Sequence, residues 1–406
     1  MGVKSVNKFL IFIFVLVTIN SFPIITLNLH MMSDEQAKDV LLDVKNKIEQ
    51  LAPDYTEIIF DSATPASYDL FFFIEYNASL EVYIGEWKED SKIVSRCEYD
   101  PKGYKFYKDF IMECVSCPLE KASFKKFSMG DFSSPFRLTY HPALDEYPDF
   151  SPDGKYICFI SDRIGGNRNI FLIDKETGKL IPKPVYGSSE YFPKFSPSGN
   201  KMVFQGSLHG NWNIYTMPLE NYSKSIRRIS SGRAPAYSPN WLDEDKVIYV
   251  QDHATSNYFV VADTRTLKRK VIGLPFDRIF SPTPHGSDLY FVGLKKADFG
   301  IYKLTPDGSI ITVEDTEYNE HDPCIKGDFL VFTSNRDGIY RLWAKDMKTG
   351  KVWCLTKDIP YDTFYPVFSP DGSLIAFSVY KTGSEPDIWI IRFNPSEESS
   401  PLNDLP

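Results

Sequence analysis

The stretch YPDFSPDGKYICFISDRIGGNRNIFLID, residues 147–174, contains the pattern that decides the fold. Its SPDG segment, residues 151–154, suits a type I β-turn, because proline fixes φ at the second position and serine and glycine favour the ends. The apolar runs YICFI and NIFLI on either side of a polar, glycine-rich segment indicate two strands joined by a hairpin. The FSPDG turn returns at residues 368–372, so this unit is repeated along the chain.

Six copies of the unit can be aligned on the proline that precedes each turn. The prolines are separated by 45, 42, 47, 41 and 43 residues, and they are Pro148, Pro193, Pro235, Pro282, Pro323 and Pro366. A period in the forties with strand-rich repeats is typical of a β-propeller, in which each repeat forms one four-stranded blade. An aromatic content of 15% also favours β-structure.

The two ends of the repeat region predict how the ring closes. The sixth repeat stops after its third strand, DIWIIRF, and residues 396–406 form a polar tail. Upstream of the first repeat, FRLTY at 136–140 has the sequence of a fourth strand. Pairing it with the last blade would hide the sheet edges that otherwise invite aggregation. We therefore predict a mainly β fold with a six-bladed β-propeller at 134–395, closed by strand 136–140.

Residues 33–133 lack the repeat pattern. Ser33-Asp-Glu-Gln36 is a capping box, and the apolar residues that follow, up to Leu51, fall on one helical face. The strand-like runs TEIIF, DLFFFIEY and LEVYIG come next. This order predicts a small α+β domain.

Residues 1–30 have the character of an export segment. Lys4 and Lys8 flank an apolar run that starts at Phe9, as in a signal peptide. The apolar character continues to Leu29, long enough to span a bilayer, so a retained anchor through residues 9–29 is an equal alternative. Lysines before the run would leave the body outside. We expect an exported protein. It would be periplasmic, extracytoplasmic in another location, or anchored in the membrane with the propeller outside.

The six cysteines fall into two groups. Cys114 and Cys117 have the spacing of a redox or metal-binding pair, but no second pair accompanies them as a structural zinc site requires. We predict a local disulfide that involves Cys97. The other three lie in apolar strand-like runs and are predicted to be buried thiols, namely Cys158, Cys324 and Cys354.

The repeat xPxFSPDGxxIxF followed by SxRxGxxxIY, together with the export segment and the small domain, resembles the TolB-type propeller family, whose repeats are WD40-like. The match is best at 147–173, 192–217 and 365–391, and the resemblance covers about two-thirds of the chain. It implies a six-bladed propeller and a partner-binding role at the cell envelope. It implies little about specific chemistry, because the motif residues build blades.

Several function classes lack their sequence signals. No G-x-S-x-G nucleophile elbow, HExxH, glycine-rich phosphate loop or EF-hand spacing occurs, so we expect no cofactor and no metal. The net charge of −9 comes without a basic stripe, which argues against nucleic acid. The leading hypothesis is a non-enzymatic protein that binds a protein partner or another envelope component.

The concave mouth of the channel is the expected binding site of a propeller. On the repeat alignment, eight charged or titratable residues fall near the starts of the innermost strands, and they are Asp145, Glu146, Glu190, Arg233, Arg278, Glu320, His321 and Asp362. A competing interpretation is that they are solvated or hydrogen-bond neighbouring blades. Arg163 and Arg336 recur at one repeat position, which predicts a structural role, such as bidentate pairing between blades.

The alternative function is a carbohydrate-active lyase or hydrolase that uses the channel mouth. His321 and neighbouring carboxylates would then serve as acid, base or metal ligands. Such a protein would be similar to oligogalacturonate lyases, but the chain lacks the cluster of histidines expected for their metal site.

Overall fold

The computed structural model describes residues 11–17, 26–31, 42–44, 46, 47, 50, 58–61, 70–77, 82–89, 92–99, 107–130, 132, 134–185, 187–208, 210–220, 225–253 and 255–395. The predicted tail at 396–406 lies outside these residues. The chain divides into two compact units, Met1–Lys126 with Tyr140–Pro142, and Phe127–Thr139 with Ala143–Pro406.

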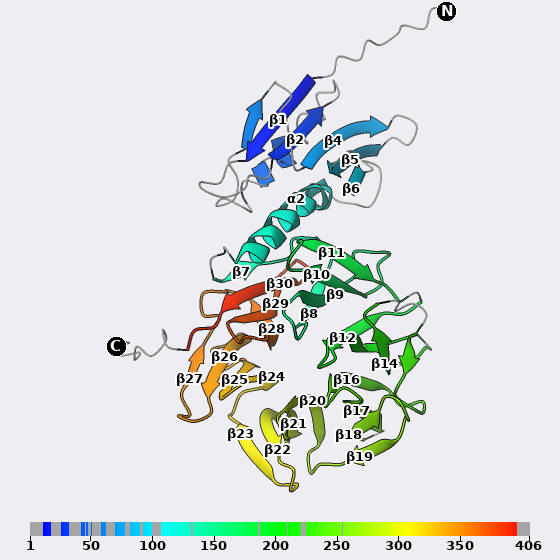
Figure 1. Ribbon diagram of the computed structural model, residues 1–406. Helices are drawn as coiled ribbons and strands as arrows, with labels where there is room; N and C mark the ends of the chain where they lie inside the picture. Colours follow the sequence, from blue (N-terminus) through cyan, green and yellow to red (C-terminus); the bar gives the residue numbers. More distant parts are fainter. Residues whose placement is uncertain are drawn as a thin grey trace, which may run out of the picture. The chain divides into compact units, whose positions relative to one another are not determined.

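The larger unit is a propeller of six four-stranded antiparallel sheets (Figure 1). The first blade consists of β8 (Asp145–Phe150), β9 (Tyr156–Ser161), β10 (Asn169–Asp174) and β11 (Lys179–Lys183). The second consists of β12 (Glu190–Phe195), β13 (Lys201–Gly206), β14 (Asn213–Pro218) and β15 (Arg227–Arg228). The third consists of β16 (Ala236–Trp241), β17 (Lys246–His253), β18 (Ser256–Asp263) and β19 (Arg269–Ile272). The fourth blade consists of β20 (Arg278–His285), β21 (Asp288–Lys295), β22 (Asp298–Leu304) and β23 (Ile310–Glu314). The fifth consists of β24 (Glu320–Lys326), β25 (Phe329–Ser334), β26 (Arg341–Asp346) and β27 (Val352–Cys354). The sixth consists of β28 (Asp362–Phe368), β29 (Leu374–Tyr380), β30 (Asp387–Arg392) and β7 (Phe136–Arg137). The predicted mainly β, six-bladed fold is confirmed.

The core of the propeller lies between adjacent blades. One apolar cluster, for example, joins Cys158 and Leu172 of the first blade to Phe195 and Met202 of the second. All six residues of β10 are buried, because a middle strand has a neighbouring blade on each face. This packing explains why the middle strands are apolar at consecutive positions instead of alternating.

The sixth blade takes its outer strand from the start of the propeller, as the sequence predicted. In this sheet β7 pairs with β30, with Phe136 opposite Ile390 and Arg137 opposite Trp389. The Arg137 guanidinium also lies 2.7 Å from the Asp387 carboxylate. Two segments from opposite ends of the propeller sequence therefore complete one sheet.

Every innermost strand contains a β-bulge with a non-glycine residue at a φ of 47° to 56°, directly before a proline. These bulge residues are Tyr147, Phe192, Ser238, Ser281, Asp322 and Tyr365. The predicted alignment was wrong in the third blade, where Pro239 follows the bulge residue and Pro235 precedes β16. A bulge bends the strand and re-aims its side chains, and here it does so at one level of all six blades.

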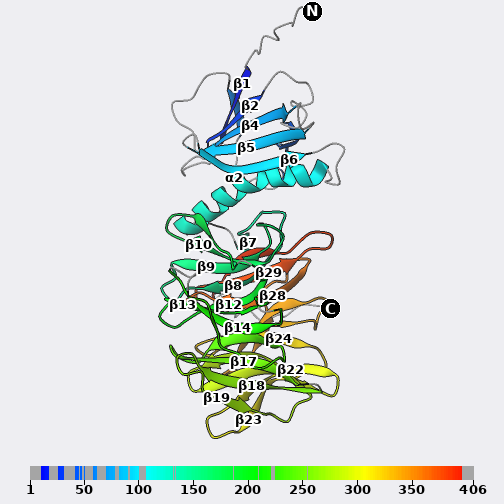
Figure 2. The same ribbon diagram turned by 90° about the vertical axis from the view of Figure 1, so that its right-hand side faces the viewer.

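The smaller unit contains a six-stranded sheet in the order β3-β1-β2-β4-β5-β6 (Figure 2). Its strands are β1 (Ile11–Val17), β2 (Thr26–Met31), β3 (Ile58–Asp61), β4 (Leu70–Asn77), β5 (Val82–Glu89) and β6 (Lys92–Tyr99), followed by helix α2 (Tyr107–Met129). The described residues between 42 and 50 are helical, and β3, β4 and β5 overlap the strand-like runs. The sequence predicted neither β6 nor α2.

Strand β1 lies within residues 1–30, and β2 begins there and ends at Met31. Among the described residues, no helix is long and apolar enough to cross a membrane. Whether residues 1–30 act as a signal peptide or an anchor stays a prediction, as do the predicted domain boundaries.

The cysteines follow the predicted division in part. Cys114 is disulfide-bonded, whereas Cys117 does not take part in a disulfide. The side chain of Cys97, which was predicted to take part in a local disulfide, lies outside the described residues. Cys158 is buried, whereas Cys324 and Cys354 are half-buried, and none of these three takes part in a disulfide.

Candidate functional site

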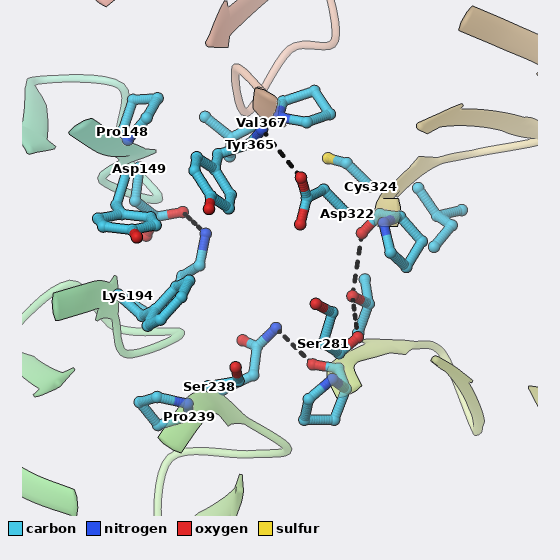
Figure 3. A pocket seen from close by; sticks show the side chains of 18 residues that line it. Pro148, Asp149, Lys194, Ser238, Pro239, Ser281, Asp322, Cys324, Tyr365 and Val367 are labelled. Carbon is cyan, nitrogen blue, oxygen red and sulfur yellow. Dashed lines mark hydrogen bonds and ion pairs between the residues drawn. The ribbon is translucent and has the colours of Figure 1, made fainter. Parts of the chain in front are cut away.

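A cavity of about 200 Å³ lies between the innermost strands (Figure 3). All six of these strands line it, each through its bulge residue and the residue two positions further on. The bulge therefore determines which side chains face the channel. The sequence alignment did not predict this cavity.

One wall of the cavity carries an ion pair between neighbouring blades. Lys194 Nζ lies 3.0 Å from Oδ1 of Asp149, and the Phe195 amide donates to Oδ2 of Asp149 at 3.0 Å. Burial raises the pKa of Asp149, although Lys194 opposes this. Burial alone would lower the pKa of Lys194, but the Asp149 charge outweighs it and the pKa is raised. The ammonium of Lys194 is therefore held in its charged form.

Asp322 carries a second carboxylate into the cavity from the opposite wall (Figure 3). The Tyr365 amide donates to its Oδ2 at 3.3 Å. Burial raises the pKa of Asp322 to about 7, opposed by the Tyr365 amide, Lys194 and the Thr333 hydroxyl. Asp322 consequently changes charge near neutral pH.

Half-buried rings form a chain of contacts around the channel at the level of the bulges. We call them the aromatic belt, which consists of Tyr147, Tyr191, Trp212, Phe280, Phe299, His321, Tyr340, Phe364 and Tyr365. Successive ring centroids lie 4.4 to 6.0 Å apart. Four members directly precede a bulge residue, and they are Tyr191, Phe280, His321 and Phe364.

Two arginines flank the aromatic belt. The Arg168 guanidinium lies 4.8 Å from the Tyr191 ring centroid and donates to its hydroxyl. The Arg278 guanidinium lies 5.9 Å from the Phe280 ring centroid and pairs with Asp252. Their side chains are 36% and 33% exposed, so both remain accessible beside the rings.

Three of the sequence-predicted site residues are buried at the first position of an inner strand. Asp145 is paired with Arg163, whose Nε donates to Ser161. Glu320 is paired with Arg336 in the same way, with Ser334 as the serine. The predicted structural pairing thus occurs within a blade, and Arg336 also reaches Glu314 of the preceding blade.

Glu190 occupies the same position in the second blade without an arginine. Glu190 lies opposite Gly206 in its sheet, just as Asp145 lies opposite Ser161 in the first blade. Two residues after these partners come Leu208 and Arg163, so a leucine takes the place of the arginine. Neither carboxylate oxygen has a hydrogen bond of normal geometry within the described residues. Burial raises its pKa to about 8, and only nearby Ser188 and backbone amides oppose this. Glu190 is therefore protonated at neutral pH.

The other five predicted residues have different surroundings. Glu146 is buried and accepts a hydrogen bond from the Tyr380 hydroxyl, and Asp362 accepts one from the Tyr340 amide at 2.8 Å. Arg278 and His321 belong to the belt region, and burial lowers the pKa of His321 to about 4. Arg233 is exposed before β16. The structure therefore does not gather the eight residues into one site.

Sequence reasoning missed the charged residues of the cavity, Asp149, Lys194 and Asp322. Each lies next to one of the aligned prolines, so the alignment contained their positions. Within the described residues, no group of three or more His, Cys, Asp or Glu side chains could hold a metal ion.

No family model matches the chain. It is 30% identical over 149 residues to an uncharacterised protein of Agrobacterium fabrum, covering 33% of this chain and 50% of that protein. It is 26% identical over 202 residues to the Tol-Pal system protein TolB of Francisella tularensis subsp. mediasiatica, covering 46% and 45%. The chain thus spans about half the length of the curated relatives it matches.

Among solved structures, the putative TolB from Agrobacterium tumefaciens is 21% identical with a TM-score of 0.48, covering 62% of this chain and 91% of that one. The sequence similarity to TolB agrees with the repeat motif and with the six blades. The chain carries a six-bladed β-propeller whose repeats are similar in sequence to TolB.

Proposed function

We propose that this protein is a non-enzymatic, exported or membrane-tethered propeller that binds a protein or other macromolecular partner at the cell envelope. The aromatic belt is the docking surface. The observation that carries the proposal is the belt itself, a nearly continuous chain of half-buried rings on five blades, flanked by Arg168 and Arg278.

The composition of the belt suits a protein interface. Tyrosine, tryptophan and arginine are enriched among the residues that contribute most binding energy, because they offer large contact areas with few rotatable bonds. Trp212 meets Tyr191 edge to face at 5.1 Å, so both rings are held in place before a partner arrives. A pre-ordered surface loses little conformational entropy on binding.

The envelope location rests on the sequence. Lys4, Lys8 and the apolar run after them have the character of an export segment. The similarity to a Tol-Pal system protein TolB agrees with a role outside the cytoplasm.

The experiment compares partner capture by three forms of the full chain in its native host. In vivo crosslinking and affinity capture are performed with wild type, Trp212→Ala and Val271→Ala, where Val271 is exposed on outer strand β19. We expect one or more partners that wild type and Val271→Ala capture equally and that Trp212→Ala captures at least several-fold less. Equal capture by all three forms, or no reproducible partner, would contradict the proposal.

The competing function is a carbohydrate-active enzyme, because flat rings also provide stacking surfaces for sugars. His321 would be its acid or base, yet the ring lies between those of Phe299 and Tyr340 and its lowered pKa leaves it neutral at pH 7. Metal analysis and an oligosaccharide screen on wild type and His321→Ala test this function. Bound metal, with turnover that the variant loses, would replace our proposal.

A further inference from the structure

The charges in the channel cavity do not balance. Asp149 and Lys194 form an ion pair across the boundary between the first two blades, so their charges offset each other. Asp322 has no lysine, arginine or histidine nitrogen within 4.0 Å among the described residues, and its one backbone contact is the Tyr365 amide. When Asp322 is ionised, the cavity therefore has an excess of one negative charge.

The cavity can admit a ligand. Lys194 lines the cavity, and 28% of its side-chain surface is not covered by other residues. The volume of about 200 Å³ has room for several heavy atoms. The cavity is thus a formed site, and no segment has to move aside to create it.

The remaining lining combines apolar walls with a few polar groups. Prolines from five inner strands, with Phe192 and Val367, present apolar surface, while Ser238 and Ser281 supply hydroxyls. An aliphatic stem with a charged end matches this combination, because such side chains bury the stem on apolar surface and pair the end group. A carboxylate that loses its solvation gains most from a cation that also donates hydrogen bonds.

We propose that the cavity binds the alkylammonium group of a lysine side chain, with Asp322 as its counter-ion. The source of that lysine rests on the proposed function: it belongs to the partner that docks on the aromatic belt. A second point of attachment inside the channel then fixes the position of the partner.

The direct test uses a small probe and the full chain. Binding of Nα-acetyl-lysine amide is measured by isothermal titration calorimetry and compared with Nα-acetyl-norleucine amide, which has the same stem without the charge. We expect the lysine probe to bind and the norleucine probe to bind about tenfold or more weakly. Equal affinity for the two probes, or no heat from the lysine probe at tens of millimolar, would overturn the proposal.

Two further comparisons identify the counter-ion. Asp322→Asn should weaken lysine-probe binding by about tenfold or more, whereas Asp358→Asn, which changes an exposed carboxylate, should not. In wild type the affinity for the lysine probe should rise as the pH increases through about 7, because Asp322 then loses its proton. The probe stays charged over this range, since the pKa of its ammonium group is about 10.4. The pH profile needs no variant, so it decides the question even if Asp322→Asn does not fold.

The outcomes separate this inference from the proposed function. If Trp212→Ala loses partner capture but the probe does not bind, the alkylammonium site is wrong and partner binding stands. If the probe binds through Asp322 but capture does not depend on the aromatic belt, the cavity site stands and the docking surface is wrong.

Discussion

Nη2 of Arg163 donates to both carboxylate oxygens of Asp145, at 3.0 and 2.9 Å, inside the first blade. Their side chains are 6% and 0% exposed, and the guanidinium also lies over Phe171, 5.3 Å from its ring centroid. Removing one partner of such a pair leaves an uncompensated buried charge, whereas an exposed pair contributes little.

We therefore expect Arg163→Ala to lower the free energy of unfolding by about 3 to 5 kcal/mol. The control is Arg265→Ala, which removes an ion pair to Asp245 from a side chain that is 73% exposed and should cost under about 1 kcal/mol. Urea denaturation of both variants measures the difference. Similar losses in the two variants would contradict the structural role of the buried pair.

Glu190 predicts a pH dependence of stability. Its pKa is about 8 in the folded protein against an ordinary 4.5, so between these values only the folded state keeps the proton. Because the folded state then binds more protons than the unfolded state, stability must fall as pH rises from 4.5 to 8.

Denaturation midpoints across this pH range should decline more steeply for wild type than for Glu190→Gln, whose amide does not titrate. Glu220→Gln, at an exposed position, is the control and should follow wild type. Parallel pH profiles for all three proteins would show that the Glu190 proton is not linked to folding.

Gly293 predicts a packing limit in the fourth blade. A Cβ there would meet Cδ1 and Cε1 of Phe276 at 2.5 Å, and that ring packs against Phe291 and Tyr302. Gly293→Ala should therefore cost about 1 to 3 kcal/mol of overpacking in a denaturation experiment. At Gly273 a Cβ meets nothing within 4 Å, so Gly273→Ala should change stability by under about 0.5 kcal/mol. An unchanged Gly293→Ala variant would mean that Phe276 moves aside easily.

Thr139 predicts a cost for weakening the closure of the ring. Its buried hydroxyl accepts the Ile388 amide at 2.9 Å. Thr139→Val keeps the shape but leaves that amide without a partner, which should cost about 1 to 3 kcal/mol. The same change at the exposed Thr312 on β23 is the control and should be close to neutral in the same denaturation assay. If Thr139→Val matches Thr312→Val, this hydrogen bond does not stabilise the closure.

Most of the propeller could be predicted from the sequence, because its blades repeat one local pattern. The number of blades follows from the repeated turn, first seen at 151–154, and from the apolar strands. The closure of the ring follows from FRLTY, a strand-like segment that belongs to none of the six repeats. The third blade shows the limit of spacing alone: both Pro235 and Pro239 fit the period, and only the pairing of β16 with β17 distinguishes them.

The site was harder to predict for two physical reasons. A bulge breaks the alternation of side chains along a strand, so the residues that face the channel, such as Asp322, do not follow a period of two. Burial also depends on distant partners: Asp145 and Glu190 look alike in sequence, yet one has an arginine 18 residues further on and the other has Leu208. Because both side chains are charged, both residues were predicted to lie at the exposed mouth of the channel.

The closure of the sixth blade sets an order of events during synthesis. Arg137 and Asp387 are 250 residues apart in sequence, so the first segment of the propeller to be made pairs with nearly the last. At typical elongation rates of about 5 to 20 residues per second, β7 would wait roughly 12 to 50 s for β30. The strands of the first five blades are therefore all synthesised before the sixth sheet has its full set of strands, so that sheet is the last one that can be completed.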